Sequence, residues 1–114
     1  MAKIEKIMVS PPVDEVVATL RTFPEVTSQG VNGDVFEFYF KNISESFGDL
    51  AVDVEEFEGY EGLLTSIDVY GTTWKERPDR VRFFFDLLVA RTTWELGSRF
   101  DANDRPLVHR PLQG

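Results

Sequence analysis

Residues 42–70 read NISESFGDLAVDVEEFEGYEGLLTSIDVY, and this stretch decides both the fold and the charge of the chain. It contains eight acidic residues, and no Lys or Arg occurs between Lys41 and Lys75. The formal net charge of the chain is -8, so these acids account for it while the charges of the flanking segments cancel. Apolar residues alternate with the acids, which predicts β-strands with one buried side and one side in water.

The first predicted strand of this stretch is LAVDVEEF, residues 50–57, in which the apolar residues at even positions alternate with Asp53 and Glu55. Glu56 breaks the alternation, so we expect the strand to end or bulge there. The following EGYEG has the length and the glycines of a hairpin loop, and residues 63–69 then alternate again. These segments predict an antiparallel hairpin.

Upstream of this stretch, residues 35–40 place three phenylalanines on one side and predict another strand, and residues 3–10 predict a short one. Between them, residues 12–23 have the helical spacing of one buried face and are ended by Pro24. Residues 25–34 contain Gly30 and the pair Asn-Gly, so we expect a loop or tight turn, as in a hairpin connection.

The opening KIEKIMVSPPVDEVVATL, residues 3–20, loosely resembles the first strand and helix of ferredoxin-like regulators of the PII type. The resemblance stops near residue 30, because the rest shows neither the long loop nor the nucleotide-binding glycines of that family. It therefore implies no function for this chain.

Downstream, residues 79–96 predict a second and longer helix that Gly97 stops. This helix has one broad apolar face and an opposite apolar face that includes Phe83, Leu87 and Trp94. A surface helix needs only one apolar face, so the second must be covered by the C-terminal tail or by another chain. Phe83, Leu87 and Trp94 are therefore candidate self-association residues of a possible homodimer.

The order β-α-β-β-β-α predicts an α+β fold, with a mostly antiparallel four-stranded sheet and two helices packed on one face. Residues 1–100 are expected to form a single domain and residues 101–114 an extended C-terminal tail. The length of 114 residues and the 42% hydrophobic content are sufficient for one core. The absence of a signal-peptide profile and of a long apolar run predicts a cytoplasmic protein.

Several kinds of chemistry are disfavoured by the residue types present. There is no cysteine, and the one histidine, His109, stands between two prolines without a surrounding motif, so neither predicts a catalytic residue. The glycines match no phosphate-binding loop, and the acids do not have calcium-loop spacing. We therefore expect no cofactor and no metal site, and a non-enzymatic function is favoured.

The acidic charge argues against binding to nucleic acid, and nothing indicates a membrane partner. It suits a basic protein partner, and the charge and size resemble those of immunity proteins that neutralise basic toxins or nucleases. The predicted partner-binding residues are Asp53, Glu55, Phe57, Glu58, Tyr60, Glu61 and Asp68. Two alternatives remain open. One is a solvated face that serves solubility, and the other is a small-molecule or enzymatic pocket between sheet and helices, with polar groups such as Tyr39, Asp86 or Arg91.

Overall fold

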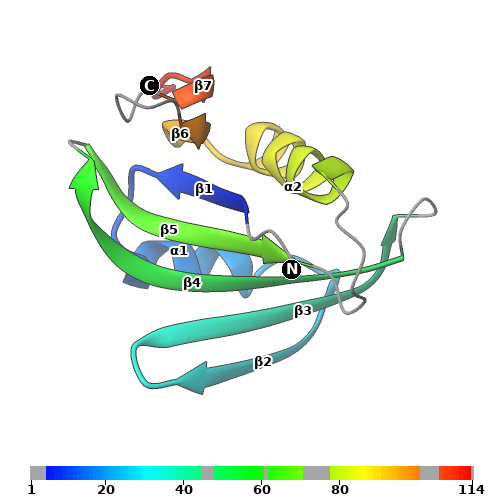
Figure 1. Cartoon of the computed structure of the whole chain (residues 1–114). Coiled ribbons are helices and arrows are strands. Elements are labelled where there is room, and N and C mark those ends of the chain that lie inside the picture. The colour runs from blue at the N-terminus through cyan, green and yellow to red at the C-terminus, as the bar shows by residue number, and fades with distance from the viewer. Residues whose placement is uncertain (1–4, 45–47, 61, 71–77, 101–105, 114) are drawn as a thin grey trace.

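The computed structural model describes residues 5–44, 48–60, 62–70, 78–100 and 106–113 of the chain. Within these residues the chain forms two helices and one seven-stranded sheet, and neighbouring strands are antiparallel throughout. The strands follow the order β2-β3-β4-β5-β1-β6-β7. Figure 1 shows that the sheet is curved, with β2 at one edge and β7 at the other.

Within the described ranges, the chain begins with a single strand and a helix, continues with four strands, and ends with the second helix and two more strands. The first strand is β1 (Glu5–Val9), followed by α1 (Val13–Leu20) and the paired strands β2 (Val26–Asn32) and β3 (Val35–Ser44). The next pair is β4 (Gly48–Tyr60) and β5 (Leu63–Tyr70). Helix α2 (Pro78–Arg91) precedes the last pair, β6 (Leu96–Phe100) and β7 (Pro106–Arg110).

This sheet corrects the predicted architecture. A four-stranded sheet with two helices packed on one face, in the order β-α-β-β-β-α, is wrong, because β2, β6 and β7 also join the sheet. Strand β2 occupies the predicted loop 25–34, β6 begins within the predicted helix 79–96, and β7 lies in the predicted tail 101–114. The observed order is β-α-β-β-β-β-α-β-β, a largely β variant of the α+β class.

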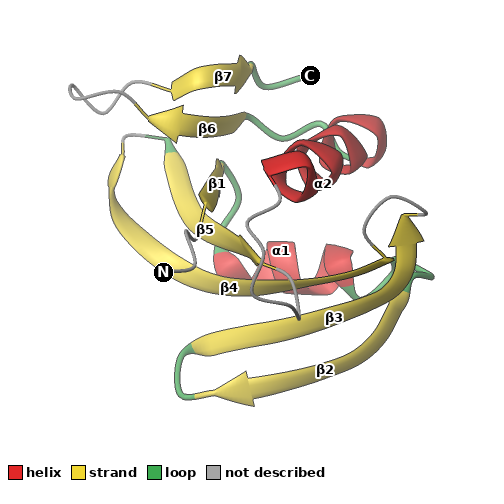
Figure 2. Ribbon diagram, turned by 45° about the vertical axis from the view of Figure 1, so that its right-hand side comes forward, coloured by secondary structure: helices red, strands yellow, loops and turns green. Residues whose placement is uncertain are grey.

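A single hydrophobic core includes residues of both helices, which Figure 2 shows together with the sheet. Helix α1 packs against β4 and β5, and α2 packs against β1 and β5. The register aligns Phe38, Val52 and Val69 across β3, β4 and β5, and all three side chains are buried. The rings of Phe40 and Phe84 meet edge to face with their centroids 5.5 Å apart. The polar residues that alternate with these strand positions therefore point away from the core.

Helix α2 ends at Arg91, whereas the sequence predicted a helix as far as Leu96. Thr92 takes part in this ending, because its backbone N–H and its hydroxyl both donate to the Leu88 carbonyl, at 2.9 and 2.7 Å. The residues after the helix, 92–95, connect it to β6. The period of apolar residues therefore continues past the point where the helix stops.

Arg110 of β7 holds the C-terminal end of α2 from the far end of the chain. Its Nε donates to the Trp94 carbonyl at 2.8 Å, and one terminal nitrogen donates to the Thr92 carbonyl at 2.8 Å. The other terminal nitrogen donates to the Val89 carbonyl at 3.3 Å. The guanidinium donates the hydrogen bonds that these carbonyls need. It also supplies the positive charge that is favoured at the C-terminal end of a helix dipole. The predicted tail thus contains a structural anchor for α2.

Candidate functional site

A row of charged side chains crosses four strands on the side of the sheet that faces away from the core. The register places Asp53 of β4 opposite both Glu37 of β3 and Asp68 of β5, and it places Asp68 opposite Lys6 of β1. Directly opposed residues of an antiparallel pair have Cβ atoms about 4.5–5.5 Å apart, so three carboxylates stand side by side. We call this surface the acidic face, which comprises Glu37, Tyr39, Asp53, Glu55, Asp68 and Tyr70.

Two tyrosines form the neighbouring row of the acidic face. Tyr39 and Tyr70 lie opposite Ala51 from its two sides, and Ala51 is fully buried. The Tyr70 hydroxyl donates to Oδ1 of Asp53 at 2.9 Å, and the Tyr39 hydroxyl donates to Oε2 of Glu37 at 2.9 Å. Each tyrosine therefore orients one carboxylate of the row and places an aromatic ring beside it.

The carboxyl group of Asp53 is disfavoured as an anion in this position. Burial raises its pKa above the ordinary value, while the hydrogen bond from Tyr70 opposes this rise. The carboxylates of Glu37 and Glu55 raise the pKa further. Burial and the hydrogen bond to Asp53 also raise the pKa of the Tyr70 phenol, so Tyr70 stays a neutral donor.

Asp68 is only 16% exposed, and Lys6 is the cation beside it. Burial raises the pKa of Asp68, Lys6 lowers it, and nearby carboxylates raise it again. The ammonium nitrogen of Lys6 lies 3.8 Å from Oδ1 of Asp68 and 5.2 Å from the centroid of the Phe57 ring. That Oδ1 atom is buried and accepts no hydrogen bond from the residues that the structure describes. Among the described residues, Lys6 is the cation at ion-pair distance, and it lies at the β1 end of the row of three carboxylates.

The structure places four of the predicted partner-binding residues on one side of the sheet. Asp53, Glu55 and Asp68 are half-buried on the acidic face, and Phe57 lies beside it against Lys6. The predicted residues Glu61 and the side chains of Glu58 and Tyr60 lie outside the described residues.

Glu37, Tyr39 and Lys6 were not predicted from the sequence as neighbours of these residues. Glu37 and Tyr39 alternate with the phenylalanines of β3, and this alternation already put them on the polar side of the strand. The missing information was the register, because the sequence does not show that residue 37 pairs with residue 53.

The predicted self-association residues do not share one helical face. Trp94 follows α2, is 8% exposed and belongs to the core of the single chain. Leu87 is half-buried and packs against that core, and Phe83 is also half-buried. A homodimer through Phe83 and Leu87 stays a prediction, but Trp94 does not extend that face.

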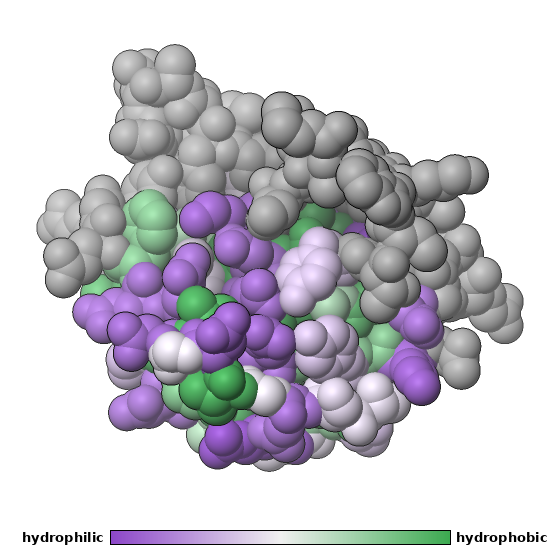
Figure 3. Space-filling model, turned by 60° about the horizontal axis from the view of Figure 1, so that its bottom comes forward, coloured by the Kyte–Doolittle hydropathy of each residue, from purple (hydrophilic) through white to green (hydrophobic). Residues whose placement is uncertain are grey.

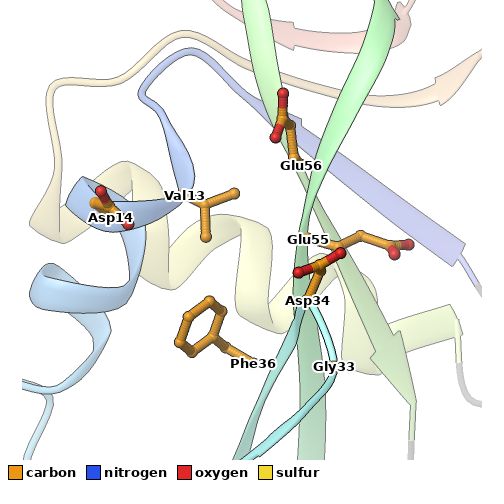
Figure 4. Close-up of a pocket in the computed structure, with 7 residues that line it drawn as sticks. All are labelled: Val13, Asp14, Gly33, Asp34, Phe36, Glu55 and Glu56. Atoms are coloured by element: carbon orange, nitrogen blue, oxygen red, sulfur yellow. The ribbon is translucent and has the colours of Figure 1, made fainter.

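An open hollow of about 610 Å³ lies between the start of α1 and strands β3 and β4. Figure 4 shows that Val13 of α1 and Phe36 of β3 extend into the space between helix and strands. The remaining lining residues are Asp14, Gly33, Asp34, Glu55 and Glu56. Of the described residues, four carboxylates and no basic side chain line the hollow, so its lining is acidic like the face of the sheet described above.

The polar groups proposed for an enzymatic pocket lie apart from this hollow and from one another. Tyr39 belongs to the acidic face, and Asp86 accepts a hydrogen bond from Arg82 at the helix surface. Arg91 binds the Glu25 carboxylate through two hydrogen bonds of 2.9 and 2.6 Å. These residues therefore do not form one site.

The remaining surface gives few other signs of chemistry. Nε2 of His109 lies 2.8 Å from a Glu95 carboxylate oxygen. No group of three acidic or histidine side chains among the described residues could hold a metal ion. In that same part of the chain, neither helix is long and apolar enough to cross a membrane.

Exposed apolar side chains are scattered over the described surface. The large ones are Val31, Leu64, Val89 and Leu112, which lie on different elements or in the C-terminal segment. Figure 3 shows mostly hydrophilic residues on the part of the surface that is coloured, with hydrophobic residues in small separate patches. Recognition through this part of the surface would depend on polar and charged groups.

Comparison with protein-family models, curated proteins and solved structures found no match for this chain.

Proposed function

We propose that this chain is a non-enzymatic module that binds a basic protein through the acidic face. The observation that carries this proposal is the position of Asp53, which stands opposite both Glu37 and Asp68. Like charges directly opposite each other destabilise a pair of strands by roughly 0.2–1 kcal/mol. Charges that serve only solubility work as well when both signs are interspersed, so solubility gives no reason to align three carboxylates.

A cationic side chain from a partner would remove this repulsion. It would favour the ionised forms of Asp53 and Asp68, whose pKa values are raised by burial in the free protein. Tyr39 and Tyr70 place aromatic rings beside the carboxylates, and such rings attract a guanidinium or ammonium group. Complementary charge of this kind also makes association fast and sensitive to salt.

The most concrete form of this function is antagonism of a basic toxin or nuclease, in the manner of immunity proteins. A nuclease binds phosphates through Lys and Arg side chains. A protein with a net charge of -8 and an aligned row of carboxylates would compete with nucleic acid for those side chains. The likeness to immunity proteins is one of charge and size.

Affinity capture followed by titration tests the proposal. The immobilised chain is exposed at low salt to a lysate of its source cells, and the captured protein is purified and titrated by calorimetry. We expect a basic protein whose affinity falls steeply with salt and drops by about tenfold or more for Asp53→Asn combined with Asp68→Asn. Glu15→Gln on the exposed side of α1 is the matched control, with an expected change of less than about twofold.

Two results would contradict the proposal. One is a captured partner that is not basic. The other is an affinity that the double substitution on the acidic face leaves unchanged while the chain stays folded. If the partner is a nuclease or toxin, stoichiometric addition of the chain should also inhibit its activity, and activity that persists at saturation would exclude antagonism.

A further inference from the structure

Strand β2 is an exposed edge of the sheet, and past the irregular register at its start the described residues give it little of the usual protection. Its sequence is VTSQGVN, without a charged residue or proline, and residues 27–32 are all exposed. Natural edge strands are usually protected by Lys, Pro, a bulge or a covering element, because their unpaired backbone groups attract other strands. The irregular register between Val26 and Ser28 affects only the start of β2. The opposite edge strand, β7, contains both Pro106 and Arg110.

The register of the β2–β3 hairpin shows which backbone groups face outward. Asn32 pairs with Val35 across the two turn residues, of which Gly33 has a φ of 62°. In a two-residue hairpin the two residues that close the turn exchange two backbone hydrogen bonds. Hydrogen-bonded and non-hydrogen-bonded pairs then alternate along the two strands. The N–H and C=O groups of Gln29 and Val31 therefore point away from β3, toward the open edge.

Gly30 lies between these two residues and opposite Glu37. It has no positive φ, and a Cβ atom added there would meet nothing within 4 Å, so neither the backbone nor the packing of this chain requires glycine. Glycine weakens a strand and commonly marks a place where another backbone or a ligand approaches. Here it leaves Glu37 uncovered on the side of the open edge, at the end of the carboxylate row.

We propose that an extended segment of the basic partner adds to β2 as an antiparallel strand, with cationic side chains that pass over Gly30 to Glu37. This inference rests on the proposed function and names the element that the partner uses. The added strand would carry cationic residues on the side of the acidic face. Its alternate residues would be apolar, because they would stand beside Val31, which is 62% exposed.

Charge decides against a second copy of this chain as the added strand. Each copy carries a net charge of -8, and an antiparallel pair of β2 strands would extend two acidic faces toward each other. Strand β2 itself contains no cation that could reach Glu37 of the other copy. A basic strand satisfies both the open backbone and the carboxylates.

The probe is the peptide acetyl-Thr-Arg-Val-Arg-Val-Arg-Thr-amide, titrated against the chain by calorimetry and by NMR. Its arginines would face Glu37, and its valines would pair with Gln29 and Val31 and exchange backbone hydrogen bonds with them. Methylation of both Val amides removes the donors that face β2, whereas methylation of two Arg amides alters donors that face water. The two methylated peptides have the same charge and composition, so they form a matched pair.

We expect Val-amide methylation to weaken binding by about tenfold or more, because two backbone hydrogen bonds of about 0.5–1.5 kcal/mol each are lost. Arg-amide methylation should change the affinity by less than about threefold. The amides of Gln29 and Val31 should gain protection from hydrogen exchange when the unmodified peptide binds. Equal affinities for the two methylated peptides would overturn the proposal while leaving binding through the acidic face intact.

Substitutions at β2 give a second test. Gly30→Thr should stabilise the free chain slightly, because Thr is favoured in strands. It should also lower the affinity for the peptide, because the Thr side chain would cover the path to Glu37. Ser28→Thr, two residues away on the same side of β2, is the matched control and should bind as wild type does. Absence of saturable peptide binding, or equal binding by both variants, would overturn the β2 proposal, and the capture experiment would then decide the proposed function on its own.

Discussion

Replacement of Asp53 by Asn tests whether the acidic face is held against electrostatic repulsion. The substitution removes the central charge of the row, keeps the shape of the side chain, and leaves an oxygen that accepts the hydrogen bond from Tyr70. Removal of this charge relieves two opposed pairs, Asp53 with Glu37 and Asp53 with Asp68. If the chain gains stability when this charge is removed and the shape of the side chain is kept, repulsion between the carboxylates is the cause.

The expected gain follows from these contacts. Two opposed like-charge pairs contribute roughly 0.2–1 kcal/mol each, and the weaker hydrogen bond to a neutral acceptor costs about 0.5 kcal/mol. We therefore expect Asp53→Asn to raise the free energy of unfolding by about 0.5–1 kcal/mol at pH 7. For a domain of this size that corresponds to a rise in Tm of roughly 2–6 °C.

The gain should depend on pH in a defined direction. Because the pKa of Asp53 is raised in the folded chain, the folded state binds a proton more readily than the unfolded state. The wild type therefore loses stability as pH rises from the ordinary Asp pKa of about 3.9 through the folded pKa. The advantage of Asp53→Asn should be absent near pH 3 and complete by pH 7.

Urea unfolding followed by circular dichroism at pH 3, 5 and 7 measures this difference. Glu56→Gln is the control, because Glu56 is an exposed residue of the same strand outside the row, and its effect should stay within about 0.5 kcal/mol. The reasoning would be refuted if Asp53→Asn were less stable than wild type at pH 7. It would also be refuted if the gain in free energy of unfolding were as large at pH 3 as at pH 7.

Three further predictions concern the contacts that hold the fold. Arg110→Lys should destabilise the chain by about 1–2 kcal/mol, because a lysine cannot reach three carbonyls at once, and urea unfolding without a loss would contradict this role. Arg91→Met should cost about 0.5–1 kcal/mol at pH 7. Because Arg91 lowers the pKa of Glu25, this cost should be lost as pH falls through that lowered pKa, and an NMR titration should show a higher Glu25 pKa in the variant. Trp94→Glu should unfold the chain, since it removes a core side chain and buries a carboxylate, and a folded monomer by circular dichroism and light scattering would show instead that Trp94 is dispensable for the core.

The central strands could be predicted from the sequence because each has one apolar and one polar side. Leu50, Val52 and Val54 are buried, and the register shifts after Glu56, where the alternation breaks. Strand β2 was missed because an exposed edge strand has no buried side and therefore no alternation to detect. Its pairing with β3 depends on the turn at Gly33, which the Asn-Gly pair did indicate.

The end of α2 could not be predicted because its cause lies far along the chain. Leu96 continues the helical period, so the pattern alone extends the helix to that residue. Arg110 binds one carbonyl in the last turn of the helix and two beyond its end, and no local signal connects it to residues 89–94. The acidic face could be predicted only in part, again because the missing information is not local. Its acids are visible in the sequence, but the register that places Asp53 opposite Glu37 is not.

The central position of β1 imposes an order on folding during synthesis. The first strand of the chain lies between β5 and β6, so one of its two edges stays unpaired until residues 96–98 have been made, and β6 needs β7 in turn. A ribosome-bound chain that has emerged only as far as α2 would present β1 as an open, apolar edge that invites pairing with other nascent chains. Interruption of translation before β6 and β7 have been made should therefore produce aggregates, whereas a chain that contains both strands hides β1 in the middle of its sheet.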